Sequence, residues 1–314
     1  MRRVLVTGGA GFIGSHLVDA LVRRGDQVRV LDDLSTGKRA NLEASAAHLE
    51  FFEGSVLDES LVARAMQGVE VVFHEAALAS VPLSVEKPMA THAACATGTL
   101  TVLDQARRAG VRRFVYAASS SCYGNQPGSS KRETDLLEPL SPYGAAKLTG
   151  ELYCQAFYHS YGLETVGLRY FNVFGPRQDP NGAYAAVIPR FVTWILAGQP
   201  LVVYGDGMQS RDFTYVENVV HGNLLAAEAD HVAGKMLNMA NGRSISLLEL
   251  IAALEKLVGV KAHVIHEPPR AGDVRDSQAD ITRARQLLSY ESKIDLMEGL
   301  SRSIDYYRAC AVHV

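Results

Sequence analysis

A tyrosine and a lysine four residues apart, Tyr143 and Lys147, have the spacing in this chain that most directly suggests chemistry. If Pro142 opens a helix, this spacing places the phenol and the ammonium side by side on one helical face. The ammonium would favour the phenolate by lowering the phenol pKa from roughly 10 toward neutrality. A phenolate can take a proton from a hydroxyl group while hydride leaves the same carbon. An isolated pair of this kind is usually a solvated helical face, so its meaning depends on other segments.

A glycine-rich loop near the amino terminus supplies a partner for this chemistry. The apolar run 4–6 leads into Gly8, Gly11 and Gly14, and a helical pattern follows. These glycines allow a tight turn, close approach of the backbone to a pyrophosphate and close packing of a helix on a strand. A second apolar run, 28–31, ends in Asp32, where a carboxylate would bind the adenosine ribose and repel a 2'-phosphate. The pattern predicts a dinucleotide site that prefers NAD to NADP.

Two further strand-like runs end in polar residues. The run 114–118 ends in a hydroxyl cluster that begins at Ser119, and the run 163–170 is followed closely by Asn172. Ligands of open parallel sheets bind beyond the carboxyl ends of the strands, so these side chains are expected in the same crevice as the dinucleotide.

With these motifs the chain resembles the extended short-chain dehydrogenases/reductases over almost all of its length, and among them the nucleoside-diphosphate-sugar epimerases. The resemblance implies reversible inversion at C4 of a UDP-linked sugar through a 4-keto intermediate. Tyr143 would be the base, Lys147 would hold the nicotinamide ribose and lower the tyrosine pKa, and Ser119 would bond the reacting oxygen. Arg211 and Arg270 would clamp the diphosphate, since the planar fork of arginine suits phosphate oxygens.

Carried over position by position, the resemblance implies two sets of binding residues. The cofactor set is Gly8, Gly11, Phe12, Ile13, Gly14, Asp32, Asp33, Lys38, Ser55, Val56, Ala76, Ala77, Tyr143, Lys147 and Tyr170. The substrate set is Ser80, Ser119, Ser121, Asn172, Val187, Val202, Tyr204, Arg211, Arg270, Asp273 and Ser277. Two departures bear on cofactor affinity. Ser55 stands where relatives usually carry an aspartate that meets adenine, and Cys95 stands where an asparagine is common.

The identity of the sugar stays open at this stage. Ser277 is small where the family has a pocket gatekeeper, which leaves room for an N-acetyl group, so UDP-N-acetylglucosamine or UDP-glucose is the expected type. A UDP-uronate is the alternative because Arg190 could meet a carboxylate, although Asn172 favours an uncharged sugar. A sugar dehydratase would need an acid and a base where Ser120 and Ser121 stand. A non-catalytic NAD-dependent sensor on the same fold is a further rival.

Composition narrows the class of protein. The 314 residues, 47% of them apolar, allow about two domains with sizeable cores, and a net charge of -3 argues against a nucleic-acid surface. No apolar stretch approaches the roughly 18 residues of a membrane span. Four cysteines without Cys-x-x-Cys spacing and histidines without a zinc pattern predict no metal site and a cytoplasmic location.

Strand-like runs alternate with helical segments through the first half of the chain, which predicts the α/β class. The expected architecture is a Rossmann-type doubly wound parallel sheet over residues 1–173, to which segments near 214–240 return. A smaller α+β lobe, 174–314, would bind the UDP-sugar. The resemblance also implies a homodimer formed through two long helices near 89–107 and 143–161.

Overall fold

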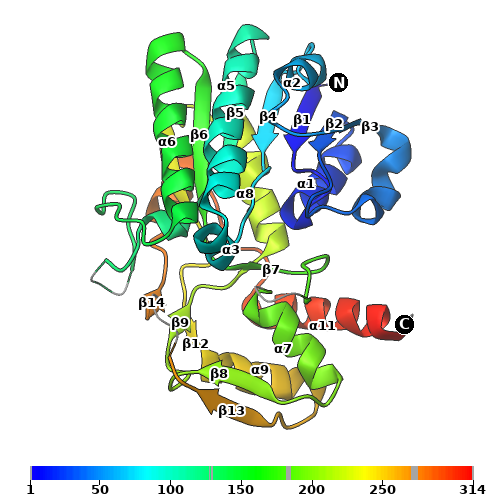
Figure 1. The fold of residues 1–314 in the computed structure, drawn as a ribbon, viewed down its shortest axis with the longest axis vertical. Coiled ribbons are helices and arrows are strands. Elements are labelled where there is room, and N and C mark those ends of the chain that lie inside the picture. Colours follow the sequence, from blue (N-terminus) through cyan, green and yellow to red (C-terminus); the bar gives the residue numbers. More distant parts are fainter. Residues whose placement is uncertain (1, 127, 129, 182–184, 270–274, 313–314) are drawn as a thin grey trace.

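A parallel sheet of seven strands organises the larger part of the molecule (Figure 1). The computed structural model describes residues 2–126, 128, 130–181, 185–269 and 275–312. The sheet has the order β11-β6-β5-β4-β1-β2-β3. Its strands are β1 (Arg3–Thr7), β2 (Gln27–Asp32), β3 (Leu49–Glu53), β4 (Val71–His74), β5 (Arg113–Ser119), β6 (Glu164–Tyr170) and β11 (Lys235–Met239).

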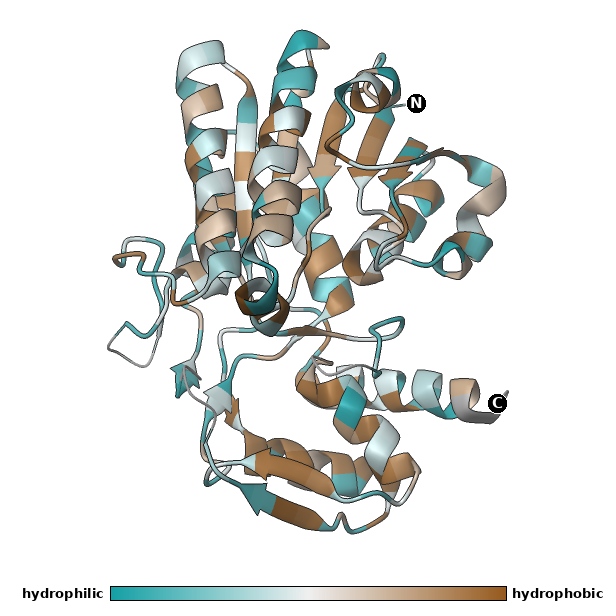
Figure 2. Ribbon diagram, viewed as in Figure 1, coloured by the Kyte–Doolittle hydropathy of each residue, from teal (hydrophilic) through white to brown (hydrophobic). Residues whose placement is uncertain are grey.

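Helices cover both faces of this sheet, which explains why its central strands are almost wholly apolar. On one face α1 (Phe12–Arg23) and α8 (Val216–Glu228) pack against alternate residues such as Val4 and Val6. On the other face α2 (Glu59–Ala65), α5 (Gly98–Arg108) and α6 (Pro142–Tyr161) pack against residues such as Leu5. The hydropathy colours show apolar strands between these layers (Figure 2). The predicted doubly wound fold is confirmed.

The order of the strands reverses at β1, which pairs with β2 on one side and with β4 on the other. From this point successive strands are therefore added outward in opposite directions along the sheet. The crevice beyond the carboxyl ends of β1 and β4 is the place where open α/β sheets bind ligands.

The smaller part is built on short strands and three helices that share one apolar core. The helices are α7 (Val187–Leu196), α9 (Leu247–Val258) and α11 (Leu296–Val312). The strands are β8 (Leu201–Tyr204), paired with β13 (Val264–Glu267), and β9 (Ser210–Arg211), which lies between β12 (Ile245–Ser246) and β14 (Asp276–Ser277). The remaining elements are η1 (Arg39–His48), α3 (Val81–Glu86), α4 (Pro88–His92), η2 (Ala93–Thr97), η3 (Ser120–Cys122), β7 (Val173–Phe174), β10 (Thr214–Tyr215) and α10 (Thr282–Leu288).

The chain passes between the two parts more than once. After β10 it enters α8 and adds β11 to the edge of the large sheet beside β6. These elements occupy the range near 214–240 that the sequence analysis assigns to a return. Residues Ala279, Ala284 and Tyr290, around α10, also belong to the core of the large sheet, although they lie within the stretch 174–314 expected to form the smaller lobe.

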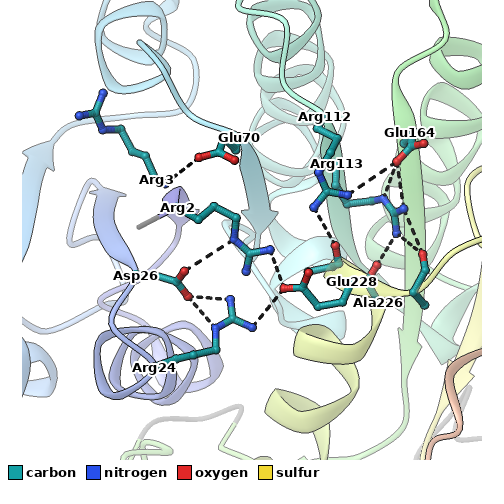
Figure 3. A network of polar contacts seen from close by, with 12 residues as sticks. Arg2, Arg3, Arg24, Asp26, Glu70, Arg112, Arg113, Glu164, Ala226 and Glu228 are labelled. Atoms are coloured by element: carbon teal, nitrogen blue, oxygen red, sulfur yellow. Dashed lines mark hydrogen bonds and ion pairs between the residues drawn. The ribbon is translucent and has the colours of Figure 1, made fainter.

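Charged side chains form a network of ion pairs and hydrogen bonds at the opposite end of the sheet, where its strands begin (Figure 3). Arg113 is buried, and it donates to the carbonyl oxygens of Ala226 (2.6 Å) and Ala229 (3.0 Å) at the carboxyl end of α8 and to Glu164 (2.9 Å). Helix ends carry unpaired carbonyl groups, so a guanidinium there both satisfies them and opposes the helix dipole.

Of the helices in the described ranges, none combines the length and apolar character that a membrane crossing requires.

Candidate active site

Two glycines sit where only glycine fits, Gly8 in the loop between β1 and α1 and Gly14 in the first turn of α1. Gly8 has φ +68, and a Cβ built on it would lie 2.6 Å from the backbone nitrogen of Ala76. A Cβ on Gly14 would lie 2.2 Å from the carbonyl oxygen of Gly8. Gly11 precedes α1, and no side chain caps that helix. Phe12 and Ile13 form its first turn, so its backbone N–H groups are available to an anion in the crevice.

Asp32 ends β2 beside this loop. Its carboxylate accepts hydrogen bonds from the backbone nitrogens of Ala10 and Leu34, each at 2.8 Å. Burial raises the Asp32 pKa, and these two hydrogen bonds oppose that rise. Asp33 instead bonds its own turn through Ser35 at 2.6 Å. Asp32 is therefore the acid that the fold holds rigidly at the crevice.

Other residues of the predicted cofactor set surround the same strand ends. Lys38 reaches across to Asp179, with 3.2 Å between Nζ and Oδ2. Ser55 follows β3 and accepts from the backbone nitrogen of Leu57 at 3.2 Å, while Val56 is buried in the core. Ala76 and Ala77 follow β4, where the close approach of Gly8 fixes the main chain.

Helix α6 begins where the sequence predicts. Ser141 caps it by accepting from the backbone nitrogen of Gly144 at 3.1 Å, and Pro142 occupies its first turn. Tyr143 and Lys147 therefore lie one turn apart on the helix. Ser119, the last residue of β5, acts on the Tyr143 hydroxyl and lowers its pKa.

The Lys147 ammonium is buried and donates to the carbonyl oxygen of Ala117 at 2.8 Å. Burial lowers the Lys147 pKa. Tyr143 is partly buried, and burial raises its pKa well above the ordinary value. Ser119 lowers it again only in part. Without the cofactor, burial therefore holds the Tyr143 pKa above its ordinary value, and the lowered phenol pKa stays a prediction for the protein with NAD bound.

Glu75 joins this group without any sequence signal. Tyr170, at the end of β6, donates its hydroxyl hydrogen to Glu75 Oε1 at 2.7 Å, and Asn223 of α8 bonds the same hydroxyl at 2.8 Å. Burial raises the Glu75 pKa to about 7, while the hydrogen bond from Tyr170 and the charge of Lys147 oppose the rise.

A pocket of about 140 Å³ in the smaller part gathers four predicted substrate residues, Val187, Val202, Tyr204 and Arg211. Arg211 Nη1 donates to the carbonyl oxygens of Ser210 (2.8 Å) and Arg275 (3.1 Å). The other residues that line the pocket are Arg190, Phe191, Gln209, Phe213 and Leu247.

The remaining predicted substrate residues lie on separate segments. Asn172 has φ +34, and its amide nitrogen is 3.4 Å from the carbonyl oxygen of Asp212. This contact connects the end of β6 to the segment that follows Arg211. Ser277 pairs with Arg211 between β14 and β9.

Two predicted serines have backbone contacts near the crevice. Ser80 caps α3 by accepting from the backbone nitrogen of Leu83 at 3.2 Å. Ser121 donates its backbone N–H to Ser119 Oγ, also at 3.2 Å. Arg270 and Asp273, predicted for the diphosphate and the uridine ribose, lie outside the described residues.

This geometry agrees with comparisons to known proteins. A model of the NAD dependent epimerase/dehydratase family matches residues 4–240. The chain belongs to this family. A structure of UDP-glucose 4-epimerase from Thermotoga maritima with UDP-glucose is 39% identical, with a TM-score of 0.94, over 98% of this chain and 99% of that one. A UDP-N-acetylglucosamine 4-epimerase from Methanobrevibacter ruminantium, in complex with UDP-N-acetylmuramic acid, is 38% identical, with a TM-score of 0.94 and the same coverage.

A UDP-glucuronic acid 4-epimerase from Bacillus cereus, solved with UDP-glucuronic acid and NAD, is 32% identical, with a TM-score of 0.92 over 98% of this chain and 99% of that one. NAD is the cofactor of this epimerase-family chain. The loop around Gly8 and Gly14 fits it, since both positions lack room for any side chain and the loop leads into an uncapped helix start.

Sequence reasoning missed part of the site of this family member. Glu75 follows the buried strand β4 as a lone acid, and its partner Tyr170 is 95 residues away. Gln209 and Phe213 line the pocket from irregular segments on either side of β9, and Leu247 lines it from the first position of α9, so no periodic pattern marks them. A glutamate directly after a buried strand, in a fold that binds ligands at strand ends, is the signal that points to Glu75.

Proposed function

We propose that this protein reversibly inverts C4 of a UDP-hexose. The observation that carries the proposal is the position of Tyr143 one helical turn from the buried Lys147, whose ammonium donates to the Ala117 carbonyl oxygen two residues before Ser119 on β5. These three side chains lie at the carboxyl end of β5. In the same sheet β4 lies between β5 and β1, the strand that leads into the glycine loop. That arrangement supports a proton acceptor facing a substrate hydroxyl in the cofactor crevice.

In the proposed mechanism Tyr143, as phenolate, removes the proton of the C4 hydroxyl. NAD, when bound, accepts the C4 hydride and returns it to the other face of the sugar. Ser119 holds the reacting oxygen, and Lys147 supplies positive charge below the tyrosine and binds the nicotinamide ribose. Because burial disfavours the phenolate in the protein alone, the base depends on positive charge that arrives with the oxidised nicotinamide.

Binding far from C4 would keep the 4-keto sugar in the site while it turns over. Val202 and Tyr204 of β8 would contact the uracil, and Arg211 would bind the diphosphate. Arg270 and Asp273 are proposed to complete this hold on the nucleotide. Ser277 beside Arg211 leaves room for a C2 substituent, so UDP-N-acetylglucosamine or UDP-glucose is the proposed substrate type.

One observation favours a second candidate, a UDP-glucuronate 4-epimerase. Arg190 lines the same pocket as Arg211 and would suit a carboxylate. Against a dehydratase, the segment after Ser119 is η3, and its residues Ser120, Ser121 and Cys122 include no carboxyl group. The non-catalytic sensor is disfavoured by the position of Tyr143 one helical turn from the buried Lys147.

The test is to incubate the purified protein with UDP-glucose, UDP-N-acetylglucosamine and UDP-glucuronate in separate reactions without added NAD, and to identify the products. We expect the C4 epimer of UDP-N-acetylglucosamine or of UDP-glucose. In Tyr143→Phe we expect kcat to fall by about 10²–10⁴-fold, since the general base is removed. A 4-keto-6-deoxy product would instead indicate a dehydratase.

Tyr161→Phe is the matched control because it removes a phenol from the exposed far end of the same helix. This variant should retain wild-type activity. Equal activity of wild type and Tyr143→Phe would rule out the proposed base. Product from UDP-glucuronate alone would replace the hexose assignment with the uronate one.

We also propose that the protein forms a homodimer and works in a reducing cytosol. Exposed apolar side chains on neighbouring helices support the dimer, among them Met89 of α4 and Leu152 of α6. All four cysteines are unpaired, which supports a reducing environment.

A further inference from the structure

Glu75 follows β4, and its carboxyl is hydrogen-bonded to Tyr170, the residue of β6 that pairs with Ser119 of β5. The carboxyl therefore lies at the strand ends that also carry Ser119, the proposed partner of Tyr143. The backbone nitrogen of Glu75 donates to the carbonyl oxygen of Thr7 at 3.1 Å, and its main chain would contact any Cβ placed on Gly8. The side chain is directed to β6, where it accepts the hydrogen bond of Tyr170. Glu75 is partly buried, and burial raises the pKa of its carboxyl.

Charged and titratable groups face this carboxyl from two neighbouring elements. Lys147 and Tyr143 act on it from α6, and Tyr170 acts on it from β6. Asn223, from α8, is neutral and fixes the Tyr170 hydroxyl. An ionised Glu75 raises the pKa of both Tyr143 and Lys147, so its charge favours the protonated form of each.

We propose that Glu75 is a positioning residue whose charge controls how readily Tyr143 gives up its proton. The inference rests on the proposed function, because it assigns a regulator to the same base. When Glu75 is neutral, nothing at this position opposes the Tyr143 phenolate. When Glu75 is ionised, its negative charge holds the proton on Tyr143 and the positive charge on Lys147. The two acids therefore titrate as a coupled pair.

The pH dependence follows from this coupling. Because the Glu75 pKa is raised to about 7, its charge develops in the range where a general base is useful. In the NAD-loaded wild type, where the charge of the nicotinamide is proposed to lower the Tyr143 pKa, the acidic limb of kcat/KM should be broad, because Glu75 and Tyr143 then ionise over overlapping ranges. Glu75→Gln keeps an oxygen for the Tyr170 hydroxyl and removes the charge. Its limb should be that of a single ionisation at lower pH.

The deciding measurement is carbon-13 NMR of the NAD-loaded protein, labelled at tyrosine Cζ and glutamate Cδ. The Tyr143 and Glu75 signals are assigned by their loss in Tyr143→Phe and Glu75→Gln. We expect Glu75 to titrate well above its ordinary range. In Glu75→Gln the Tyr143 pKa should fall by at least about half a unit, a roughly threefold rise in phenolate at a fixed pH below that pKa. Tyr143→Phe should shift the Glu75 titration reciprocally.

Glu43→Gln is the control, because it removes the same charge from an exposed position of η1. It should leave both titrations unchanged. The proposal is overturned if Glu75 titrates in its ordinary range with NAD bound, or if Glu75→Gln leaves the Tyr143 pKa where it was. A loss of kcat that is equal at every pH would likewise indicate a purely structural role. The NMR titration needs no turnover, so failure of every UDP-sugar to react would reject the proposed function and leave this test intact.

Discussion

At the scale of single residues, we expect the ionisation of Glu75 to lower the free energy of unfolding of the cofactor-free protein. The unfolded carboxyl titrates near 4.5 and the folded one at about 7. Between these values the unfolded state holds fewer protons, so the free energy of unfolding must fall as pH rises. At about 1.4 kcal/mol per pKa unit the loss reaches about 3 kcal/mol above pH 7. Glu75→Gln should therefore be more stable than wild type at pH 8, and the difference should vanish toward pH 4.5.

Urea unfolding at several pH values from 4.5 to 8 measures this difference directly. Glu43→Gln serves again as the control, and its offset from wild type should not change across that range. A stability difference between Glu75→Gln and wild type that is the same at pH 4.5 and pH 8 would mean that Glu75 ionises normally.

The roles of single residues were predictable only where the spacing of residues along the chain indicates them. The four-residue interval of Tyr143 and Lys147 and the glycines of the loop predicted a helix face and a dinucleotide turn, and both structural features are present. The ionisation of Tyr143 was not predictable, because it depends on burial by elements distant in the chain. Glu75 was missed for the same reason, since Tyr170 and Asn223 meet it only in the folded protein.

At the scale of elements, a buried ion pair fixes α6 on the sheet. Glu151 lies one helical turn beyond Lys147 and accepts hydrogen bonds from Arg169 of β6 at 2.7 and 3.0 Å. Arg169 also donates to the Tyr123 hydroxyl at 2.8 Å. Arg169→Met would leave the Glu151 carboxylate buried without a cation. We expect it to lower the free energy of unfolding by about 3–5 kcal/mol.

Chemical denaturation measures this loss, and the double variant Glu151→Gln/Arg169→Met should recover part of it because no charge remains buried. The pair of Arg29 and Glu50, in which the Glu50 side chain is exposed, provides a comparison, and Glu50→Gln should cost less than about 1 kcal/mol. A cost of that small size for Arg169→Met would contradict a structural role for the buried pair.

The strands and α6 were predictable from the sequence because each has an apolar run or a start signal of its own. The segment 89–107, expected as one long helix, is instead divided into α4, the π-helical η2 and α5. Thr99 Oγ1 donates to the carbonyl oxygen of Cys95 at 2.6 Å within this segment. Hydrophobic periodicity does not distinguish a π-helical turn from an α-helical one. The two-residue strands β9, β12 and β14 are too short to carry a pattern at all.

At the scale of the whole molecule, buried polar groups hold the two parts together. The Asp212 carboxylate, next to Arg211, accepts from the backbone nitrogens of Asn241 (3.1 Å), Gly242 (2.9 Å) and Ala279 (3.2 Å). These partners come from the segments that leave the large sheet and return to it. The pocket beside Arg211 is thereby fixed relative to the crevice, an arrangement that depends on long-range packing and has no counterpart in local sequence.

The proposed homodimer makes its prediction at this scale. On the two helices expected to form the dimer, Leu103 and Phe157 are buried in the protein's own core and Leu100 packs against it, whereas Leu152 of α6 is 57% exposed. Met89 of α4, a helix that packs on α6, is 78% exposed. A second copy of this face would cover both side chains in a two-fold arrangement. Sedimentation velocity at micromolar concentration should therefore give the mass of a dimer.

Leu152→Arg should convert that dimer to a monomer, because the arginine would have to be buried against its symmetry mate. Leu287→Arg introduces the same charge on the exposed side of α10 and should leave the dimer intact. A wild-type protein that sediments only as a monomer would reject the proposal outright. In a two-fold interface through Leu152 the new arginine would be present twice, and the two charges would repel each other. A dimer that persists in Leu152→Arg would therefore show that the interface lies on another face.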